Sequence, residues 1–276
     1  MTHQVGIRRE YKIQERYRED FDKEITEWIK DGILVTYNKN VHGDIKNWVP
    51  LMAVEQQKGD IHKVRPVCDF RELNKLLESH PGGAVPICRD RLQQWRQMGV
   101  PLCLLDLKRA YLQIRIDPSL WCWQAVVWKG KDYLLTRLGF GICSAPKIMT
   151  KIVEKCLKRI DDIECSSYID DVCIKGGQIE GNKVRLELSK MGLLSKPVER
   201  VGISEPVRIL GLKVTSDLNW QRDGVLTKFC DEIASKRRLH QVIGEVLGHY
   251  PRMGWLRVVC VSQGPEASCR RQSEMG

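Results

Sequence analysis

The sequence has no long apolar run. No stretch of about 18 consecutive apolar residues occurs in its 276 residues, so we expect no transmembrane helix and no membrane partner. The first residues, Met1 to Gln4, lead into charged sequence without the apolar core of a secretory signal. Together these absences exclude the membrane and secretory classes, and we expect an intracellular protein.

Paired cysteines are also missing. The 11 cysteines are an odd number, none forms a Cys-x-x-Cys pair, and most lie in apolar segments such as Leu102 to Leu104 and Val172 to Ile174. This pattern excludes a disulfide framework and a zinc ribbon. It predicts small core residues in a reduced, intracellular protein.

The chain is, by contrast, rich in basic residues. Lys and Arg outnumber Asp and Glu by 45 to 35, which gives a net charge of +10 and a pI near 9.1. A basic balance favours a polyanionic partner. With 42% hydrophobic and 29% charged residues, the length suits one large globular domain or two ordinary ones.

Two adjacent carboxylates, Asp170 and Asp171, stand between β-prone residues, which predicts strand, tight turn, strand. If Ile169 and Asp170 form the tip, the turn favours φ > 0, which a β-branched residue dislikes, and such strain is often kept at functional sites. Two carboxylates held together repel each other unless a cation lies between them. An isolated Asp-Asp pair is usually a solvated turn, and we expect Asp161-Asp162 to be one.

A third carboxylate, Asp106, ends the apolar β-run 102–107, where an unpaired charge is costly. Antiparallel pairing of this run with the Asp170-Asp171 hairpin would bring the three side chains to one edge of a sheet. Two-metal phosphoryl transfer requires such a set, with two divalent ions about 3.5–4 Å apart bridged by shared carboxylates. Oxygen ligands suit Mg²⁺.

Periodicity and turn signals predict the other elements. We expect helices at 10–31, 88–98, from Ser144 (as N-cap) to about 159, and 179–191; hairpins from 48–55 with 62–70 and from 124–128 with 133–138; a single strand at 206–214; a basic helical segment at 227–258; and a disordered stretch from 262 to 276.

Taken in order, the motifs resemble the reverse transcriptase domain of gypsy-like LTR retrotransposons, an RNA-directed DNA polymerase. Val64 to Asn74 resembles the fingers block, Leu105 to Ile114 the first catalytic motif, Leu138 to Pro146 the second, Tyr168 to Asp171 the third, and Leu210-Gly211 the primer grip. The similarity extends over about residues 20–258. Each motif alone is weak evidence for the family, but the occurrence of all of them in this order makes chance agreement very improbable.

The resemblance implies an α+β, right-hand polymerase fold with fingers, a ferredoxin-like palm (an antiparallel sheet backed by helices) and a partial helical thumb. The implied division is an N-terminal extension at 1–15, fingers and palm at 16–216 (fingers 16–81 and 117–143, palm 82–116 and 144–216), a thumb at 217–260 and a disordered tail at 261–276. The implied location is the cytoplasm, including virus-like particles, or the nucleus.

The resemblance also implies roles for individual residues. Asp106, Asp170 and Asp171 would be catalytic and would hold two Mg²⁺ ions, with Mn²⁺ as a substitute and the Leu107 carbonyl as an extra ligand. The implied nucleotide-binding residues are Lys58, Arg65, Ala110, Tyr111 and Phe140, and the implied template- and primer-binding residues are Arg71, Tyr168, Leu210 and Gly211. Tyr111 would block a ribose 2′-OH, so the substrates would be dNTPs on a primed RNA or DNA template.

One departure from the family pattern concerns the lysine that protonates pyrophosphate. Either Lys196 or Arg200 stands in that region, and arginine is a poor acid because it hardly deprotonates. The choice between the two stays open at the level of the sequence.

Three readings compete. The chain carries no ribonuclease H carboxylates, no Asp-Thr-Gly or Asp-Ser-Gly protease motif and no integrase His/Cys pattern, so we expect one segment of a polyprotein or a degraded copy. A degraded copy would be a catalytically inactive relic that binds nucleic acid through its basic residues. An RNA-dependent RNA polymerase shares the palm chemistry, but Tyr111 and the Tyr-x-Asp-Asp hairpin argue against it.

Overall fold

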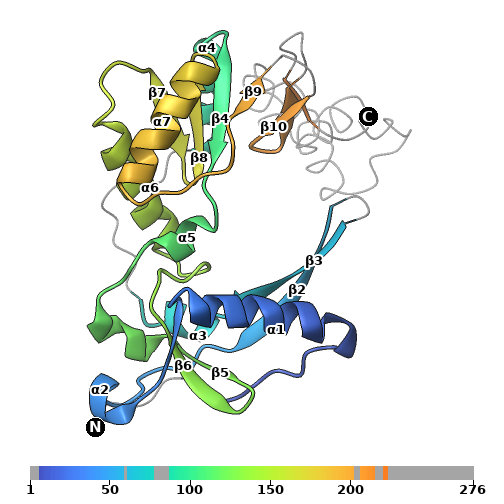
Figure 1. Cartoon of the computed structure of the whole chain (residues 1–276), viewed down its shortest axis with the longest axis vertical. Helices are drawn as coiled ribbons and strands as arrows, with labels where there is room; N and C mark the ends of the chain where they lie inside the picture. Colours follow the sequence, from blue (N-terminus) through green and yellow to red (C-terminus); the bar gives the residue numbers. More distant parts are fainter. Residues whose placement is uncertain (1–5, 59–60, 78–86, 202–205, 215–219, 223–276) are drawn as a thin grey trace, which may run out of the picture.

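The computed structural model describes residues 6–58, 61–77, 87–201, 206–214 and 220–222, which form two lobes (Figure 1). Most of the predicted thumb at 217–260, and all of the tail at 261–276, lie outside the described residues. No described helix is long and apolar enough to cross a membrane.

The first lobe, here called the palm lobe, is built on a four-stranded antiparallel sheet. Its order is β7 (Cys165–Tyr168), β8 (Asp171–Lys175), β4 (Leu102–Asp106) and β9 (Glu199–Val201). Because side chains alternate along a strand, Cys103 and Leu105 of β4 enter one core while Leu102 and Leu104 enter another. The sheet is therefore buried on both faces.

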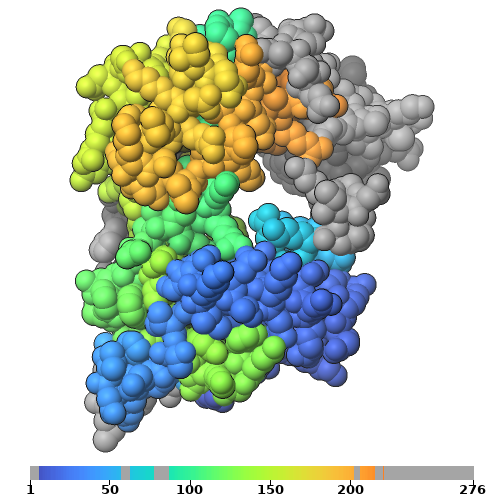
Figure 2. All heavy atoms as spheres, in the orientation of Figure 1, coloured from blue at the N-terminus to red at the C-terminus, as the bar shows by residue number. Residues whose placement is uncertain are grey.

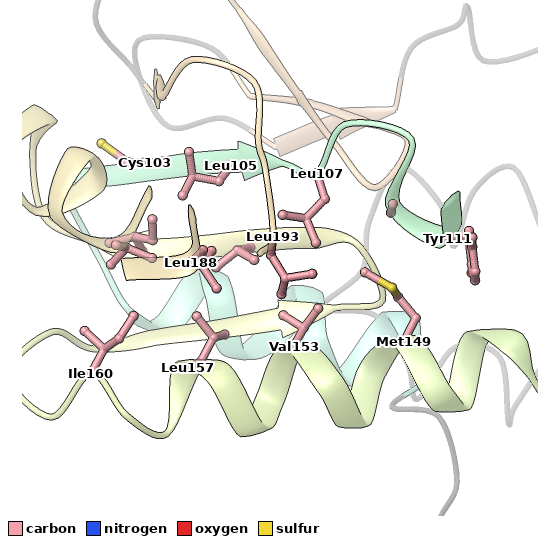
Figure 3. Close-up of a cluster of buried hydrophobic side chains, with 14 of the residues drawn as sticks. Cys103, Leu105, Leu107, Tyr111, Met149, Val153, Leu157, Ile160, Leu188 and Leu193 are labelled. Atoms are coloured by element: carbon pink, nitrogen blue, oxygen red, sulfur yellow. The ribbon is translucent and has the colours of Figure 1, made fainter. Parts of the chain in front are cut away.

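Different elements cover the two faces. Helices α6 (Ala145–Leu157) and α7 (Gln178–Lys190) cover the first, and Figure 3 shows Met149, Val153 and Leu157 of α6 pointing toward the strands. The opposite face packs against α4 (Cys88–Gln97) and a small sheet of β10 (Val207–Ile209), β11 (Leu212–Val214) and β12 (Trp220–Arg222).

The second lobe, here called the fingers lobe, is organised by α1 (Glu15–Lys30), whose buried face carries Phe21, Ile25 and Trp28 at helical spacing. This face packs on the hairpin of β2 (Leu51–Lys58) and β3 (Ile61–Cys68) and on the sheet β1 (Leu34–Thr36), β6 (Lys131–Leu135) and β5 (Ala125–Trp128). The short elements α2 (Lys39–His42), α3 (Arg71–Asn74) and the 3-10 helix Pro118–Trp123 complete the lobe.

A single turn of helix, α5 (Ala110–Gln113), belongs to both lobes. Ala110 and Tyr111 are buried in the palm core, whereas Leu112 packs against the fingers core. Ile142 likewise touches both cores. The residues just after β4 therefore form the junction between the lobes (Figure 1).

One predicted helix start needs correction and another is confirmed. The first helix begins at Glu15 rather than at residue 10, because the Glu10 carboxylate accepts hydrogen bonds from the amides of Lys129 (2.9 Å) and Gly130 (3.1 Å) and so ties the preceding segment to the β5–β6 turn. Ser144 does occupy the N-cap position of α6, but its side chain makes no capping hydrogen bond.

Two strand predictions also differ from the structure. In the first hairpin the first strand lies further along the chain than predicted, since it runs from Leu51 to Lys58 rather than over 48–55. The second strand, Ile61–Cys68, overlaps the predicted 62–70. The predicted single strand at 206–214 is a hairpin, because Leu210 (φ 46°) and Gly211 (φ 82°) are both left-handed. Two consecutive left-handed residues make a tight two-residue turn.

Candidate active site

Three polar side chains form a row across the palm sheet. Tyr168 of β7 pairs with Asp171 of β8, which pairs with Asp106 of β4. The expected antiparallel pairing of β4 with the hairpin is thus observed, with the two carboxylates directly opposite each other. By strand alternation the row lies on the face of Leu104 and Cys173, which α4 and the small sheet cover further along.

The third carboxylate is held at the tip of the β7–β8 turn. Ile169 has φ 57°, so the strain expected of a β-branched residue at this turn is present. The Leu107 amide donates a 3.2 Å hydrogen bond to the Asp170 carbonyl, which fixes the tip to the end of β4. The three carboxylates therefore belong to one rigid corner of the sheet.

The electrostatics of this corner disfavour negative charge. Burial, and then the charges of Asp170 and Asp106, raise the pKa of Asp171 to about 7. The pKa of Asp170 is also raised, by burial and by the charge of Asp106. Like charges in a partly desolvated site repel, and a bound cation would relieve that repulsion.

A cationic side chain already lies beside one of these carboxylates. The Lys196 ammonium is 2.5 Å from Asp106 Oδ2, and the Lys196 amide donates to the Asp106 carbonyl at 2.8 Å. Arg200, the other candidate in this region, pairs in register with Cys103, three residues away along β4. The structure therefore brings Lys196, and not Arg200, to the carboxylates.

Gln113 fixes the segment that carries Lys196. Its side-chain amide accepts from the Leu194 amide (2.6 Å) and donates to the Leu194 carbonyl (2.9 Å), and the Lys108 amide donates to the same carbonyl (2.9 Å). Sequence reasoning missed Gln113, because nothing local links it to a residue 81 positions further on.

The donor chemistry of the corner fits a hard divalent cation. Three carboxylates provide oxygen ligands of the kind that Mg²⁺ prefers. The raised pKa values of Asp170 and Asp171 mean that a bound cation would favour the ionised forms of these two groups. Among the described residues, however, no group of three or more His, Cys, Asp or Glu side chains is already arranged to hold a metal ion. Lys196 occupies one carboxylate instead.

Two aromatic side chains, Tyr111 and Phe140, contact each other near Asp170. Tyr111 is 9% exposed, and its ring centroid lies 5.2 Å from that of Phe140, which is 63% exposed. Burial, followed by the charge of Asp170, raises the pKa of Tyr111 to about 12. Tyr111 is therefore a neutral, rigid ring next to the carboxylates, with buried Ala110 beside it in the chain.

Asn74 holds the loop that presents Phe140. Its side-chain amide donates to the Gly141 carbonyl and its oxygen accepts from the Cys143 amide, both at 2.9 Å. Gly139 is required here, because a Cβ at that position would lie 2.1 Å from the Phe70 ring. Sequence reasoning placed Asn74 in the fingers block but did not assign it this contact.

Comparison with known families agrees with this geometry. Residues 56–201 match the family described as reverse transcriptase (RNA-dependent DNA polymerase). The chain belongs to this family. Its relatives include the Pro-Pol polyprotein of Simian foamy virus type 1, 26% identical over 186 residues, and the enzymatic polyprotein of Soybean chlorotic mottle virus, 28% identical over 151 residues. These matches cover 65% and 51% of this chain but 14% and 22% of the polyproteins.

Solved structures show the same fold. The foamy viral protease-reverse transcriptase dRH in complex with double-stranded DNA aligns with a TM-score of 0.64 at 21% identity, over 86% of this chain and 41% of that one. The foamy viral enzyme in complex with an RNA/DNA hybrid aligns with a TM-score of 0.62 at 21% identity, over 89% and 32%. The expected right-hand reverse transcriptase fold is confirmed.

The other residues predicted to bind nucleotide, template or primer stand on elements other than the strands and turn that carry Asp106, Asp170 and Asp171. Arg65 is exposed on β3, and Lys58 ends β2 with a side chain outside the described residues. Arg71 is exposed and binds the Asp69 carboxylate at 2.6 Å. The Leu210-Gly211 turn joins β10 to β11, and Leu210 packs on the same core as Tyr168.

The surface between the β2–β3 hairpin and the palm lobe is concave. The β2–β3 hairpin extends from the fingers lobe toward the side of the palm lobe that carries β9 and β10 (Figure 1). Figure 2 shows a hollow between the palm lobe and the outer part of this hairpin, at the level of the segment that joins the lobes.

Proposed function

We propose that the chain is the polymerase segment of a gypsy-like LTR retrotransposon polyprotein. It adds deoxynucleotides to the 3′ end of a primer on an RNA or DNA template. The observation that carries this proposal is the register that sets Asp106 opposite Asp171, with Asp170 at the adjoining turn. The foamy viral neighbours solved with double-stranded DNA and with an RNA/DNA hybrid support a template–primer duplex as the partner.

In this proposal Asp106, Asp170 and Asp171 hold two Mg²⁺ ions, for which Mn²⁺ can substitute, and the Leu107 carbonyl is a further ligand. When bound, the ions lower the pKa of the attacking hydroxyl and neutralise the leaving pyrophosphate. Asp171 must lose its proton before it can act as a ligand. Because its pKa is about 7 without metal, protons compete with Mg²⁺ for this carboxylate, and the Mg²⁺ concentration needed for activity should fall as pH rises toward neutrality.

Lys196 is the proposed proton donor to pyrophosphate. It lies at the carboxylates, as a general acid must, whereas Arg200 is further along the strand and loses its proton too reluctantly. A divalent cation bound at Asp106 would compete with the Lys196 ammonium and free it for the substrate.

In this proposal, residues outside the carboxylate set bind the nucleotide, the template and the primer. Lys58 and Arg65 grip the triphosphate, Ala110 and Phe140 line the nucleotide pocket, and Tyr111 excludes the 2′-OH. The template and primer contacts are assigned to Arg71, Tyr168, Leu210 and Gly211. Tyr168 extends the carboxylate row and Leu210 packs on the same face, which supports the approach of a primer end from that side.

The two cores support the division into fingers at 16–81 and 117–143 and palm at 82–116 and 144–216. The exceptions lie at the junction, where Leu138 is buried in the palm core, Leu112 packs on the fingers core and Ile142 touches both. The thumb at 217–260, and any contact with other segments of the polyprotein, remain part of the proposal. We place the enzyme inside the cell, in the cytoplasm with its virus-like particles or in the nucleus.

Primer extension by the full chain tests the proposal. With poly(rA)/oligo(dT), Mg²⁺ and dTTP we expect extension that Asp170→Asn reduces at least about a thousandfold, since each carboxylate acts only as part of the set. Asp161→Asn, in the other Asp-Asp pair, is the matched control and should keep full activity.

The same assay separates the competing readings. Salt-sensitive duplex binding without extension in Mg²⁺ or Mn²⁺ would instead identify a non-catalytic binding protein. Extension with ribonucleotides as efficient as with deoxynucleotides would indicate an RNA polymerase.

Tyr111 is tested by sugar selection. Tyr111→Ala should reduce discrimination against ribonucleotides by about 10- to 100-fold, because it removes the ring that fills the space of a 2′-OH. Tyr111→Phe keeps the ring and should keep the discrimination. Unchanged selection in the alanine variant would remove Tyr111 from this role.

A further inference from the structure

Arg109 has an unusual backbone between two functional residues. It lies three positions after Asp106 and two before Tyr111, and its φ of 44° and ψ of 45° are left-handed. Only glycine adopts this conformation without strain. The surroundings must therefore hold Arg109 in place.

The Arg109 side chain leaves the palm lobe and reaches α1 of the fingers lobe. Its Nη2 atom is 3.0 Å from Glu27 Oε2 and 3.1 Å from Glu24 Oε2, and its Nη1 atom is 3.8 Å from Asp31 Oδ2. Residues 24, 27 and 31 are spaced to lie along one face of a helix. One guanidinium thus faces three acidic side chains, and the Glu24 carboxylate also lies 3.6 Å from Lys63 Nζ on β3.

This network differs from an ordinary surface ion pair. Single exposed pairs contribute little, but networks with good Arg geometry contribute more. The Glu24 side chain is only 18% exposed, so its charge is better satisfied by Arg109 than by water. The C-terminal half of α1 lies beside α5 in Figure 1, at the junction where Tyr111 enters one core and Leu112 the other.

We propose that Arg109 is a positioning residue that clamps α1 of the fingers lobe to the segment between Asp106, which ends β4, and Tyr111 of α5. Through this clamp the fingers lobe sets the position of the Tyr111 ring, and hence the fit of the incoming nucleotide. The proposal rests on the proposed polymerase function for its kinetic consequence, but the clamp itself can be measured without activity.

The kinetic test compares the full chain with Arg109→Ala, Arg109→Lys and the double variant Glu24→Gln/Glu27→Gln. We expect the KM for dTTP to rise about 5- to 10-fold and discrimination against ribonucleotides to fall in Arg109→Ala and in the double variant, with kcat changed by less than about twofold. Arg109→Lys keeps the charge but not the planar fork and should recover part of the loss.

Two further variants separate positioning from folding. Arg109→Gly relieves the left-handed strain while deleting the guanidinium, so it should melt at or above the temperature of Arg109→Ala and yet show the same kinetic defect. Glu19→Gln removes an exposed acid from the same helix and should behave as the parent chain. Unchanged KM and sugar selection in Arg109→Ala would overturn the proposal.

The clamp is also measured without turnover, so that its failure and the failure of the proposed function remain distinct. In a double-mutant cycle on melting temperature, Arg109→Ala combined with Glu24→Gln/Glu27→Gln should cost less than the sum of the two changes. Amide exchange of α1 should accelerate in each variant. Additive melting shifts with unchanged exchange would refute the clamp even if the parent chain polymerises, and coupled shifts would support it even if the chain does not.

Discussion

The chain contains the same dipeptide twice, in two opposite environments. Asp161 and Asp162 are exposed after α6, and Asp162 forms an ion pair with Lys183 of α7, whose hydrogen bond lowers the pKa of that carboxyl. Asp170 and Asp171 are partly buried at the β7–β8 turn, and their pKa values are raised. The first pair is the solvated turn that its flanking charges predict.

The difference shows what marks a carboxylate pair as a site. The exposed pair already has a cationic partner and gains little from any ligand. The buried pair is set opposite a third carboxylate and is short of positive charge, so it gains from binding a cation. Perturbed pKa values on a rigid element are therefore better evidence for function than the residue types alone.

The first contrast between the pairs concerns the stability of the folded chain when no metal ion is bound. Ionised Asp171 destabilises the folded state, because its pKa of about 7 lies above that of an unfolded chain and each pKa unit is worth about 1.4 kcal/mol. We expect Asp171→Asn to raise the free energy of unfolding by on the order of 2 kcal/mol at about pH 8. Urea denaturation with a chelator present measures this change.

Asp162→Asn is the matched control in the other pair. It removes an ion-pair partner from Lys183 and should lower stability slightly. If both substitutions changed the free energy of unfolding in the same direction, the two aspartate pairs would not differ as described.

The second contrast concerns how the stability of the folded chain depends on pH at the Asp170-Asp171 pair. Since the folded pKa of Asp171 is raised, the folded state binds the proton more tightly than the unfolded state does. The contribution of this group to stability is complete below about pH 4 and is lost as pH rises to about 7. Without metal, the melting temperature of the parent chain should therefore decrease relative to that of Asp171→Asn over this interval. A parallel decline in both proteins would contradict the assignment.

Added Mg²⁺ should reverse that loss at the buried pair alone. A cation that binds only the folded state stabilises it by mass action, by about 2.7 kcal/mol at a hundred times its dissociation constant. We expect a Mg²⁺-dependent rise in melting temperature at about pH 8 that Asp162→Asn retains and Asp170→Asn loses. Equal shifts in all three proteins would show that the ion binds elsewhere.

Local pattern alone was sufficient to find the carboxylate corner. Alternation and strand-ending charges predict that Asp106 meets Asp170 and Asp171, and β-branched Ile169 at a tight turn predicts the strain that is observed. Such features depend on neighbours in the sequence or on a single strand pairing.

Contacts between distant segments could not be predicted in this way. Lys196 reaches Asp106 because the chain after α7 returns beside β4, first at Ser195 opposite Leu107 and then as β9, which no local signal specifies. The link from Arg109 to α1 depends on the relative placement of two lobes. The turn at Leu210 was missed because a leucine rarely adopts a left-handed φ.

The smallest expected effect compares the lysine partners of the two pairs. Lys196 and Asp106 are both about half exposed, so their ion pair contributes at most about 1 kcal/mol. Lys196→Met should therefore lower the Mg²⁺ concentration needed for half of the thermal stabilisation by no more than about fivefold. Lys183→Met, which deprives Asp162 of its partner, should leave that concentration unchanged. If both lysine variants shift it equally, the effect is one of net charge, whereas a shift confined to Lys196→Met means that this ammonium and the metal ion compete for the same carboxylate.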